Sequence, residues 1–200
     1  MHRTSFVLFF FLFAFICSGQ YNWKLEKDKE GIKVFTSDVA HSPFKAIKVE
    51  CTLKGSYTKL LTILGRVSDF SDWIYNTKLT KMVKQINAND FTYYSETHLP
   101  WPMANRDVVI RVRVKTDSLP NFLTIAGNDE SNEVIEIPGK VRVKHYKSYW
   151  KVTAPAPGSI RIFYILELDP GGSIPAWIAN MFADKGPYGT FANLAEQLKK

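Results

Sequence analysis

Apolar and charged residues alternate between residues 107 and 116, and this pattern constrains the fold more than any other feature of the chain. The even positions from 108 to 114 are apolar and most odd positions are charged: Val108, Ile110, Val112 and Val114 against Arg111, Arg113 and Lys115. Alternation with period two indicates a strand with one face buried and the other in water. Residues 44–53 and 159–168 alternate in the same way. We therefore expect an antiparallel sheet that packs on one side only.

Residues 140–153 alternate too, but the phase changes partway. Val141 and Val143 occupy odd positions, whereas Tyr146, Ser148 and Trp150 occupy even ones. A β-bulge near residues 144–145 would place both sets on the same face of one strand. The segment 153–158, TAPAPG, then predicts the turn into the next strand.

A long amphipathic helix is predicted at the C-terminal end. Its apolar residues follow the i, i+3, i+4, i+7, i+8 spacing of one helical face: Ile174, Trp177, Ile178, Met181 and Phe182. Gly186, Pro187 and Gly189 interrupt the pattern before it resumes, which predicts a kink. Shorter helices are expected over 56–66 and around 70–75. The sum is an α+β fold, a curved antiparallel sheet wrapped around one long helix.

Two motifs in the chain resemble those of a known family. The sequence LPWPMANRD occupies residues 99–107 between two predicted strands, and DPGGSIPAW occupies 169–177 at the start of the last helix. Together they resemble the START family, the lipid-transfer domains related to the steroidogenic acute regulatory protein, and their phosphatidylcholine-transfer-protein-like members. The resemblance implies a helix-grip fold, within the Bet v 1-like superfamily, with one lipid held in an internal apolar cavity.

The first residues have the layout of a cleavable secretory signal. Arg3 precedes an apolar run over 6–16, and the sequence CSGQ follows at 17–20. The run is shorter than the ~20 apolar residues that span a bilayer. We predict a signal peptide over 1–19, a single lipid-binding domain over 20–200, and export to a periplasm or the extracellular space. An uncleaved anchor and a lipoprotein acylated at Cys17 are the alternatives.

The formal charge of the chain is +7, and removing residues 1–19 subtracts only Arg3. Its basic residues are scattered over alternating strand positions, which is typical of a solvated sheet face. We expect transient contact with a membrane surface, no nucleic-acid partner and a monomer. Cys51 shares the parity of the apolar positions in 44–53, which predicts a buried structural thiol.

Catalytic and metal-binding patterns are weak. The four histidines, at positions 2, 41, 98 and 145, include no pair at metal-ligand spacing. The chain has no nucleophile elbow and no phosphate-cradling glycine loop. We predict no metal, no cofactor and no enzymatic activity. One alternative is a cyclase-like enzyme of the helix-grip superfamily that acts on a hydrophobic substrate, and another is an interaction module with a vestigial cavity.

The predicted function is to bind, and to transfer or sense, one apolar lipid of the sterol, fatty acyl or phospholipid-like type. The predicted ligand-binding residues are Trp73, Tyr93, Ser95, Ile110, Val112, Tyr146, Ser148, Trp150, Trp177, Ile178, Met181 and Phe182. Some phospholipid-binding START members carry an arginine just ahead of the tryptophan in the short helix, where this chain has Asp72. The remaining inward groups are neutral and suit a mostly apolar ligand.

The loop 99–105 and the last helix are predicted to form a gate. Its residues are Trp101, Pro102, Met103, Gly186, Pro187 and Gly189, with the glycines as the hinge. Arg106 and Asp107 are predicted to be structural, with Asp107 satisfying loop amides and Arg106 packing or pairing across the sheet. Glu96 falls on the outward parity of its strand and is left out of the predicted site.

Overall fold

The structure is a computed structural model that describes residues 21–181 and 183–200. The predicted signal peptide therefore lies outside the described residues. Ten strands in the described residues form one sheet. Their bounds are β1 Lys24–Lys29, β2 Ile32–Val39, β3 Ser42–Lys54, β4 Thr77–Asn87, β5 Asp90–Thr97, β6 Arg106–Lys115, β7 Phe122–Asp129, β8 Val141–Arg142, β9 His145–Ala156 and β10 Ser159–Asp169.

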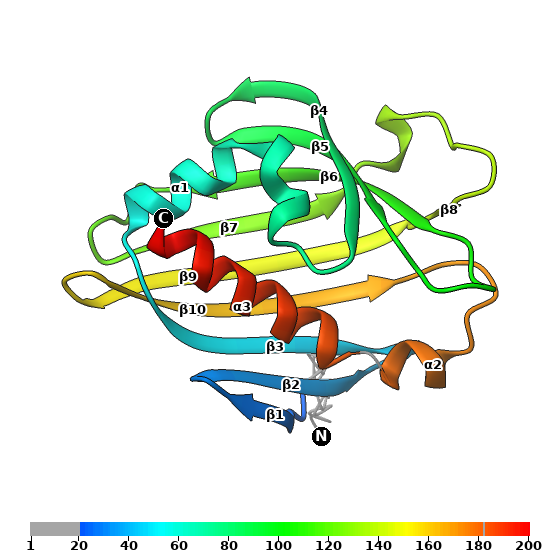
Figure 1. Cartoon of the computed structure of the whole chain (residues 1–200), viewed down its shortest axis with the longest axis horizontal. Coiled ribbons are helices and arrows are strands. Elements are labelled where there is room, and N and C mark those ends of the chain that lie inside the picture. The colour runs from blue at the N-terminus through cyan, green and yellow to red at the C-terminus, as the bar shows by residue number, and fades with distance from the viewer. Residues whose placement is uncertain (1–20, 182) are drawn as a thin grey trace, which may run out of the picture.

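In the sheet, β3 from the N-terminal part of the chain pairs with β10 from the C-terminal part. The strand order is β1-β2-β3-β10-β9-β7-β6-β5-β4, and the neighbours in this path are antiparallel. The short strand β8 lies off the path and pairs parallel with β6. Figure 1 shows a curved sheet with the C-terminal helix lying across its concave side. The predicted α+β class and the helix-grip arrangement are confirmed.

Three α-helices and two 3₁₀ helices complete the described structure. They are α1 Tyr57–Gly65, η1 Val67–Asp72, η2 Ser131–Glu133, α2 Ala176–Met181 and α3 Lys185–Lys199. The Ser56 side chain caps α1 by accepting the N–H of Lys59 at 3.2 Å. The second helix, predicted around residues 70–75, corresponds to the 3₁₀ helix η1, which begins at residue 67. None of the described helices combines the length and apolar character needed to cross a membrane.

The core lies between the concave face of the sheet and helix α3. Val49 of β3 and Ile162 of β10 are fully buried, and so is Leu194 of α3. The alternation in the sequence explains the first two, because every second side chain of each strand points toward the helix. The buried residues of α3, Phe191, Leu194 and Leu198, follow the helical period.

The phase change over residues 140–153 has a different cause from the predicted β-bulge. Residues 141–142 form β8, which pairs with β6, and β9 begins afresh at His145. The two parities therefore belong to two strands with different partners. Strand β9 also continues to Ala156, so the turn is confined to Pro157 and Gly158.

The C-terminal segment forms two helices rather than one kinked helix. Helix α2 ends at Met181 and α3 begins at Lys185, so the break lies ahead of the predicted kink. Gly186 and Pro187 lie in the first turn of α3. The first four N–H groups of a helix have no acceptor within it, so a proline in this turn removes no intrahelical bond.

Candidate functional site

A cavity of about 630 Å³ lies between the concave sheet face, helix α3 and the loop 99–105. The structure places nine of the predicted ligand-binding residues on its wall: Trp73, Tyr93, Ser95, Ile110, Val112, Tyr146, Ser148, Trp150 and Ile178. Strands β5, β6 and β9 contribute seven of them. The cavity falls within the range of ~300–1,000 Å³ that is usual for small-molecule sites.

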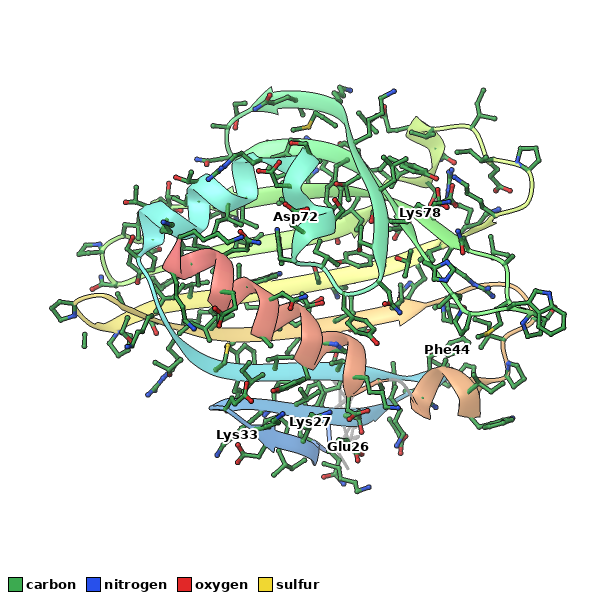
Figure 2. The ribbon with its side chains drawn as sticks, in the orientation of Figure 1. Glu26, Lys27, Lys33, Phe44, Asp72 and Lys78 are labelled. Carbon is green, nitrogen blue, oxygen red and sulfur yellow. The ribbon has the colours of Figure 1, made fainter. Side chains whose placement is uncertain are left out.

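Several further residues line the cavity that we did not select from the sequence. The aromatic members are Phe44, Phe70, Tyr75, Phe91, Tyr164 and Phe191. Tyr164 and Phe191 pack against Trp150, with ring centroids 5.0 and 5.1 Å from the indole. Both residues carried a sequence signal, because Tyr164 has the inward parity of its strand and Phe191 begins the resumed helical pattern. Phe44, labelled in Figure 2, is a lining residue of β3 that lies near α2.

Trp177 requires a correction, because its side chain does not line the cavity. It is 65% exposed, whereas Ile174 and Ile178 are on the cavity wall. Ile174 precedes helix α2, and within the helix Ile178 and Ala179 line the cavity, so the exposed Trp177 lies on the side of α2 that faces away from it. We therefore place Trp177 on the outer surface beside the cavity mouth. The side chains of Met181 and Phe182 lie outside the described part of the chain.

The predicted gate residues occupy different places. Met103 lines the cavity together with Leu99 and Pro100, whereas Trp101 is 91% exposed and Pro102 is exposed beside it. Gly186 and Pro187 also line the cavity.

Gly189 is held by close packing. A Cβ atom at this position would lie 2.6 Å from Cδ2 of Tyr75, so only glycine lets helix α3 approach that ring as closely as it does. Gly189 does not line the cavity, and the described contacts give it a packing role.

Arg106 ties together the two sequence motifs. Its side chain is buried and donates to main-chain carbonyls on both: Ala104 at 2.5 Å, Gly171 at 3.3 Å and Pro170 at 3.4 Å. Burial lowers the pKa of the Arg106 guanidinium. Arg106 thus holds the loop 99–105 and the turn before α2 together at the cavity mouth. The sequence prediction that Arg106 packs or pairs across the sheet is corrected accordingly.

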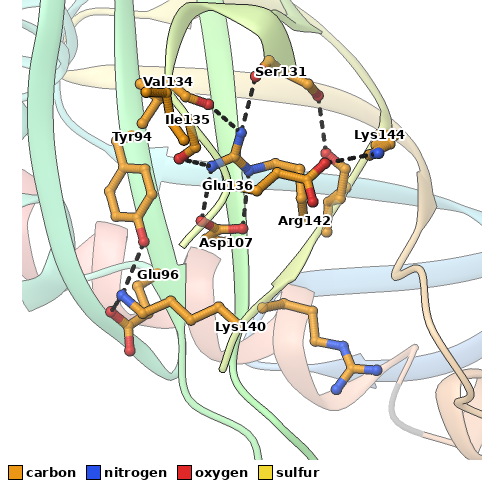
Figure 3. A network of polar contacts seen from close by, with 12 residues as sticks. Tyr94, Glu96, Asp107, Ser131, Val134, Ile135, Glu136, Lys140, Arg142 and Lys144 are labelled. Carbon is orange, nitrogen blue, oxygen red and sulfur yellow. Dashed lines mark hydrogen bonds and ion pairs between the residues drawn. The ribbon is translucent and has the colours of Figure 1, made fainter. Parts of the chain in front are cut away.

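Asp107 points to the opposite side of β6 and forms a buried ion pair. Its two carboxylate oxygens each accept a hydrogen bond of 3.0 Å from Arg142 of β8, and both side chains are 1% exposed. The Arg142 guanidinium also donates to the carbonyls of Ser131, Val134 and Ile135 (Figure 3). Asp107 therefore binds an arginine rather than loop amides. This arrangement fastens the segment 131–135 behind the mouth.

Glu96 faces outward, as its parity predicts, but its side chain is only 4% exposed. It accepts hydrogen bonds from Lys140 and, at 2.7 Å, from Asn105 Nδ2 (Figure 3 shows the contact with Lys140). The Lys140 ammonium lowers the pKa of the Glu96 carboxyl to about 2. Asn105 in turn accepts the main-chain N–H of Leu99 at 3.3 Å. Glu96 thus holds both ends of the loop 99–105 without touching the cavity.

Chemistry-bearing groups are sparse around this cavity. Residues 21–181 and 183–200 contain no group of three or more histidine, cysteine or acidic side chains that could hold a metal ion. His98 lines the cavity at the mouth, whereas His145 lies outside it. Cys51 is buried in the core, and burial raises the pKa of its thiol to about 12. That thiol is therefore a packing group rather than a nucleophile.

Two relatives resemble most of the chain. It is 32% identical to an uncharacterized protein of Pseudomonas aeruginosa, over 90% of this chain and 88% of that protein. It is 26% identical to the phosphatidylcholine transfer protein of Bos taurus, over 82% of this chain and 78% of the relative.

Solved structures share the fold. A STAR-related lipid transfer protein of Xanthomonas axonopodis superposes with a TM-score of 0.81 at 28% identity, covering 89% of this chain and 99% of the other. The Zhui aromatase/cyclase of Streptomyces superposes with a TM-score of 0.54 over 76% of this chain and 90% of its own. At 8% identity, that second likeness concerns the fold alone.

The family model for the START domain matches residues 12–194, which include both sequence motifs and all ten described strands of the sheet. That match extends over more than half of the chain. Together with the helix-grip architecture and the internal cavity, it shows that this chain belongs to the START domain family.

Proposed function

We propose that this protein carries one mostly apolar lipid in the cavity and exchanges it at a membrane surface. The observation that supports this most directly is the cavity itself, about 630 Å³ with a wall made largely of aliphatic and aromatic side chains. Burying a methylene group is worth ~0.8 kcal/mol, so a sterol or long acyl chain gains on the order of 10 kcal/mol by leaving water. Such a ligand leaves the cavity readily only into another apolar phase.

The mouth is the proposed place of exchange. Trp101 on the loop 99–105 and Trp177 on α2 are both exposed, and Figure 1 shows these two segments at the same end of the sheet. Arg106 holds the segments together. Tryptophan is favoured at the interface between membrane and water. We propose that both indoles enter that interface while the loop and α2 separate.

The contacts of the charged groups support the role of a carrier rather than an enzyme. Asp107 is taken up by Arg142, and the Arg106 guanidinium donates to three carbonyls. A general acid or base needs a side chain within reach of the substrate and free to exchange a proton. We expect a bound lipid to be recovered chemically unchanged, whereas the cyclase-like alternative requires a converted product.

Native mass spectrometry of the chain, purified without detergent, is the first test. A stoichiometric adduct that organic extraction identifies as a lipid supports the proposal. A bare mass that persists after incubation with mixed lipids contradicts it and favours an interaction module. The same spectra test the expected monomer, and the N-terminal sequence of the secreted or periplasmic protein tests the proposed cleavage near Gly19.

The mouth is tested by lipid transfer between vesicles. Replacing Trp101 and Trp177 with alanine should slow transfer several-fold while leaving the amount of lipid bound at equilibrium unchanged. Tyr149→Ala is the matched control, because Tyr149 is 41% exposed on the convex face of β9. Equal transfer rates in both variants would remove the membrane contact from the proposal.

A further inference from the structure

We propose that the cavity contains a seat for one uncharged oxygen group of the lipid, a hydroxyl or a carbonyl. The seat consists of hydroxyl side chains from three strands: Tyr93, Ser95, Tyr146, Ser148 and Tyr164. This inference rests on the proposed function, because it names the class of lipid that the cavity would hold. It favours a sterol-like lipid, a long-chain alcohol or an ester over a lipid with a charged head.

A glycine leaves the space in which these hydroxyls meet. Gly127 of β7 pairs with Ser148 of β9, and both residues line the cavity. A Cβ atom at Gly127 would lie 2.5 Å from the Ser148 Oγ and 3.2 Å from Cε1 of Tyr146. Any larger residue at position 127 would therefore fill the space between the Ser148 and Tyr146 side chains.

The hydroxyls of the seat retain capacity for a ligand. Those of Tyr93 and Ser95 make no hydrogen bond to residues 21–181 or 183–200, yet neither is among the side-chain atoms sealed from solvent without a partner. They therefore face the cavity. The Tyr146 hydroxyl interacts with those of Ser148 and Tyr164. Each hydroxyl both donates and accepts, so the cluster matches a ligand hydroxyl or carbonyl equally well.

The seat carries no charge of its own. Burial raises the pKa of all three phenols, Tyr93, Tyr146 and Tyr164, so each keeps its proton. A neutral cluster compensates a phosphate, carboxylate or ammonium group poorly. Burying such a charge without a partner costs several kcal/mol in practice.

The cations that line the cavity lie toward its mouth. Arg106 is four residues ahead of Ile110, the strand partner of Tyr93. Lys45 is four residues ahead of Val49, the strand partner of Tyr164. Four strand residues span ~13 Å, which separates the backbones of both cations from the level of Tyr93 and Tyr164. Ser95, whose strand partner Val108 is two residues after Arg106, lies nearer, but the Arg106 guanidinium is already bound to three main-chain carbonyls. The main-chain N–H of Lys45 donates to Asn180 of α2, which places this residue at the mouth.

The test uses matched pairs of lipids with the same apolar chain. Delipidated protein is incubated with 1-hexadecanol against hexadecyl phosphate, and with methyl palmitate against palmitate, and the retained adduct is measured by native mass spectrometry. We expect each uncharged lipid to be retained at least tenfold better than its charged partner. The alcohol and ester arms show whether the seat prefers a hydroxyl or a carbonyl.

Two other outcomes overturn the proposal in different ways. Equal or better retention of the charged lipids would overturn the neutral seat while leaving the lipid carrier intact. Retention of none of the four lipids would remove the proposed function and the seat together.

Variants locate the seat within the cavity. Tyr93→Phe, Tyr146→Phe and Tyr164→Phe each remove one hydroxyl and keep the ring, so we expect retention of the uncharged lipids to fall about fivefold per lost hydrogen bond. Tyr149→Phe is the control, because Tyr149 lies on the same strand as Tyr146 but on the convex face and is 41% exposed. If the three cavity variants behave like this control, the hydroxyls do not form the seat.

Discussion

The interior of the cavity and its mouth hold their residues in place by different means. Tyr93 and Ile110 face the interior from strands whose backbones pair residue by residue across the sheet. At the mouth, single side chains bind main-chain carbonyls, as Arg106 does for Ala104 and Gly171. Many backbone hydrogen bonds hold neighbouring strands together, whereas the hydrogen bonds at the mouth depend on a single side chain. The interior can therefore stay fixed while the mouth changes conformation.

The largest expected effect is the loss of the buried ion pair between Asp107 and Arg142. Asp107→Ala leaves the Arg142 cation buried without its partner, which typically destabilises a protein by ~3–5 kcal/mol. Urea unfolding followed by circular dichroism measures the change. The control is Asp28→Ala, because Asp28 and Lys33 form an exposed ion pair at 3.6 Å, which is worth ~0–1 kcal/mol. Similar losses of unfolding free energy in the two variants would show that the buried ion pair stabilises the protein no more than an exposed one.

Two glycines of α3 test whether packing or hinge motion matters at the mouth. Gly189→Ala places a Cβ 2.6 Å from the Tyr75 ring, and overpacking of this kind costs ~1–3 kcal/mol. At Gly186 the nearest atom of Tyr75 is 3.9 Å away, so Gly186→Ala fits and gains up to ~1 kcal/mol of helix stability.

Thermal unfolding and vesicle transfer, measured on both variants, separate the two explanations. Slower lipid transfer in Gly186→Ala supports the glycine hinge. A stability change confined to Gly189→Ala, with transfer unaltered in both variants, leaves the glycines with packing roles alone.

Removing the Arg106 fastener should loosen the mouth more than the interior. Arg106→Met keeps a long side chain but loses three hydrogen bonds to carbonyls, and we expect lipid exchange to accelerate about tenfold, equivalent to ~1.4 kcal/mol. Hydrogen exchange should rise over residues 99–105 and 170–175 but not in β9 and β10. Arg161→Met, on the exposed face of β10, is the control. Unchanged hydrogen exchange over residues 99–105 and 170–175 would mean that other contacts hold the mouth closed.

The last expected effect appears only in acid, as a pH dependence at Glu96. The pKa of its carboxyl is about 2 in the folded protein, against 4.5 for an ordinary glutamate. Its contribution to stability is therefore complete above pH 4.5 and is lost as the pH falls toward 2. The difference in free energy of unfolding between the protein and Glu96→Gln should shrink over the same range. A difference that is constant from pH 6 to 2 would contradict the charged contact with Lys140.

The sheet and most of the cavity wall could be predicted from the sequence, because alternation fixes which side of a strand each residue faces. Ile162 and Tyr164 follow this rule, and so does Glu96 on the outward parity. Alternation does not show which other residues pack over the outer face of the sheet. Lys140 and Asn105 bury Glu96, and Lys140 reaches it from a segment distant in the sequence.

The mouth was harder to predict because its contacts are long-range and not periodic. The partners of Arg106 and Asp107 depend on which loops meet at the start of β6, and neither loop has a repeating pattern. The break between α2 and α3 escaped prediction for a similar reason. The strongest helix-breaking residues in this region, Gly186 and Pro187, lie just after the break, where a first helical turn accepts them.

Arg106 and Asp107 are neighbours in sequence, yet they serve opposite sides of one strand. Strand geometry sends adjacent side chains to opposite faces, so Arg106 binds the loop 99–105 on one side of β6, while Asp107 holds the segment 131–135 on the other side through Arg142. Inserting one residue before this dipeptide would turn the arginine outward and the aspartate inward. A designer who exchanges the loop 99–105 for another is therefore free to vary its length only if the register of β6 is preserved.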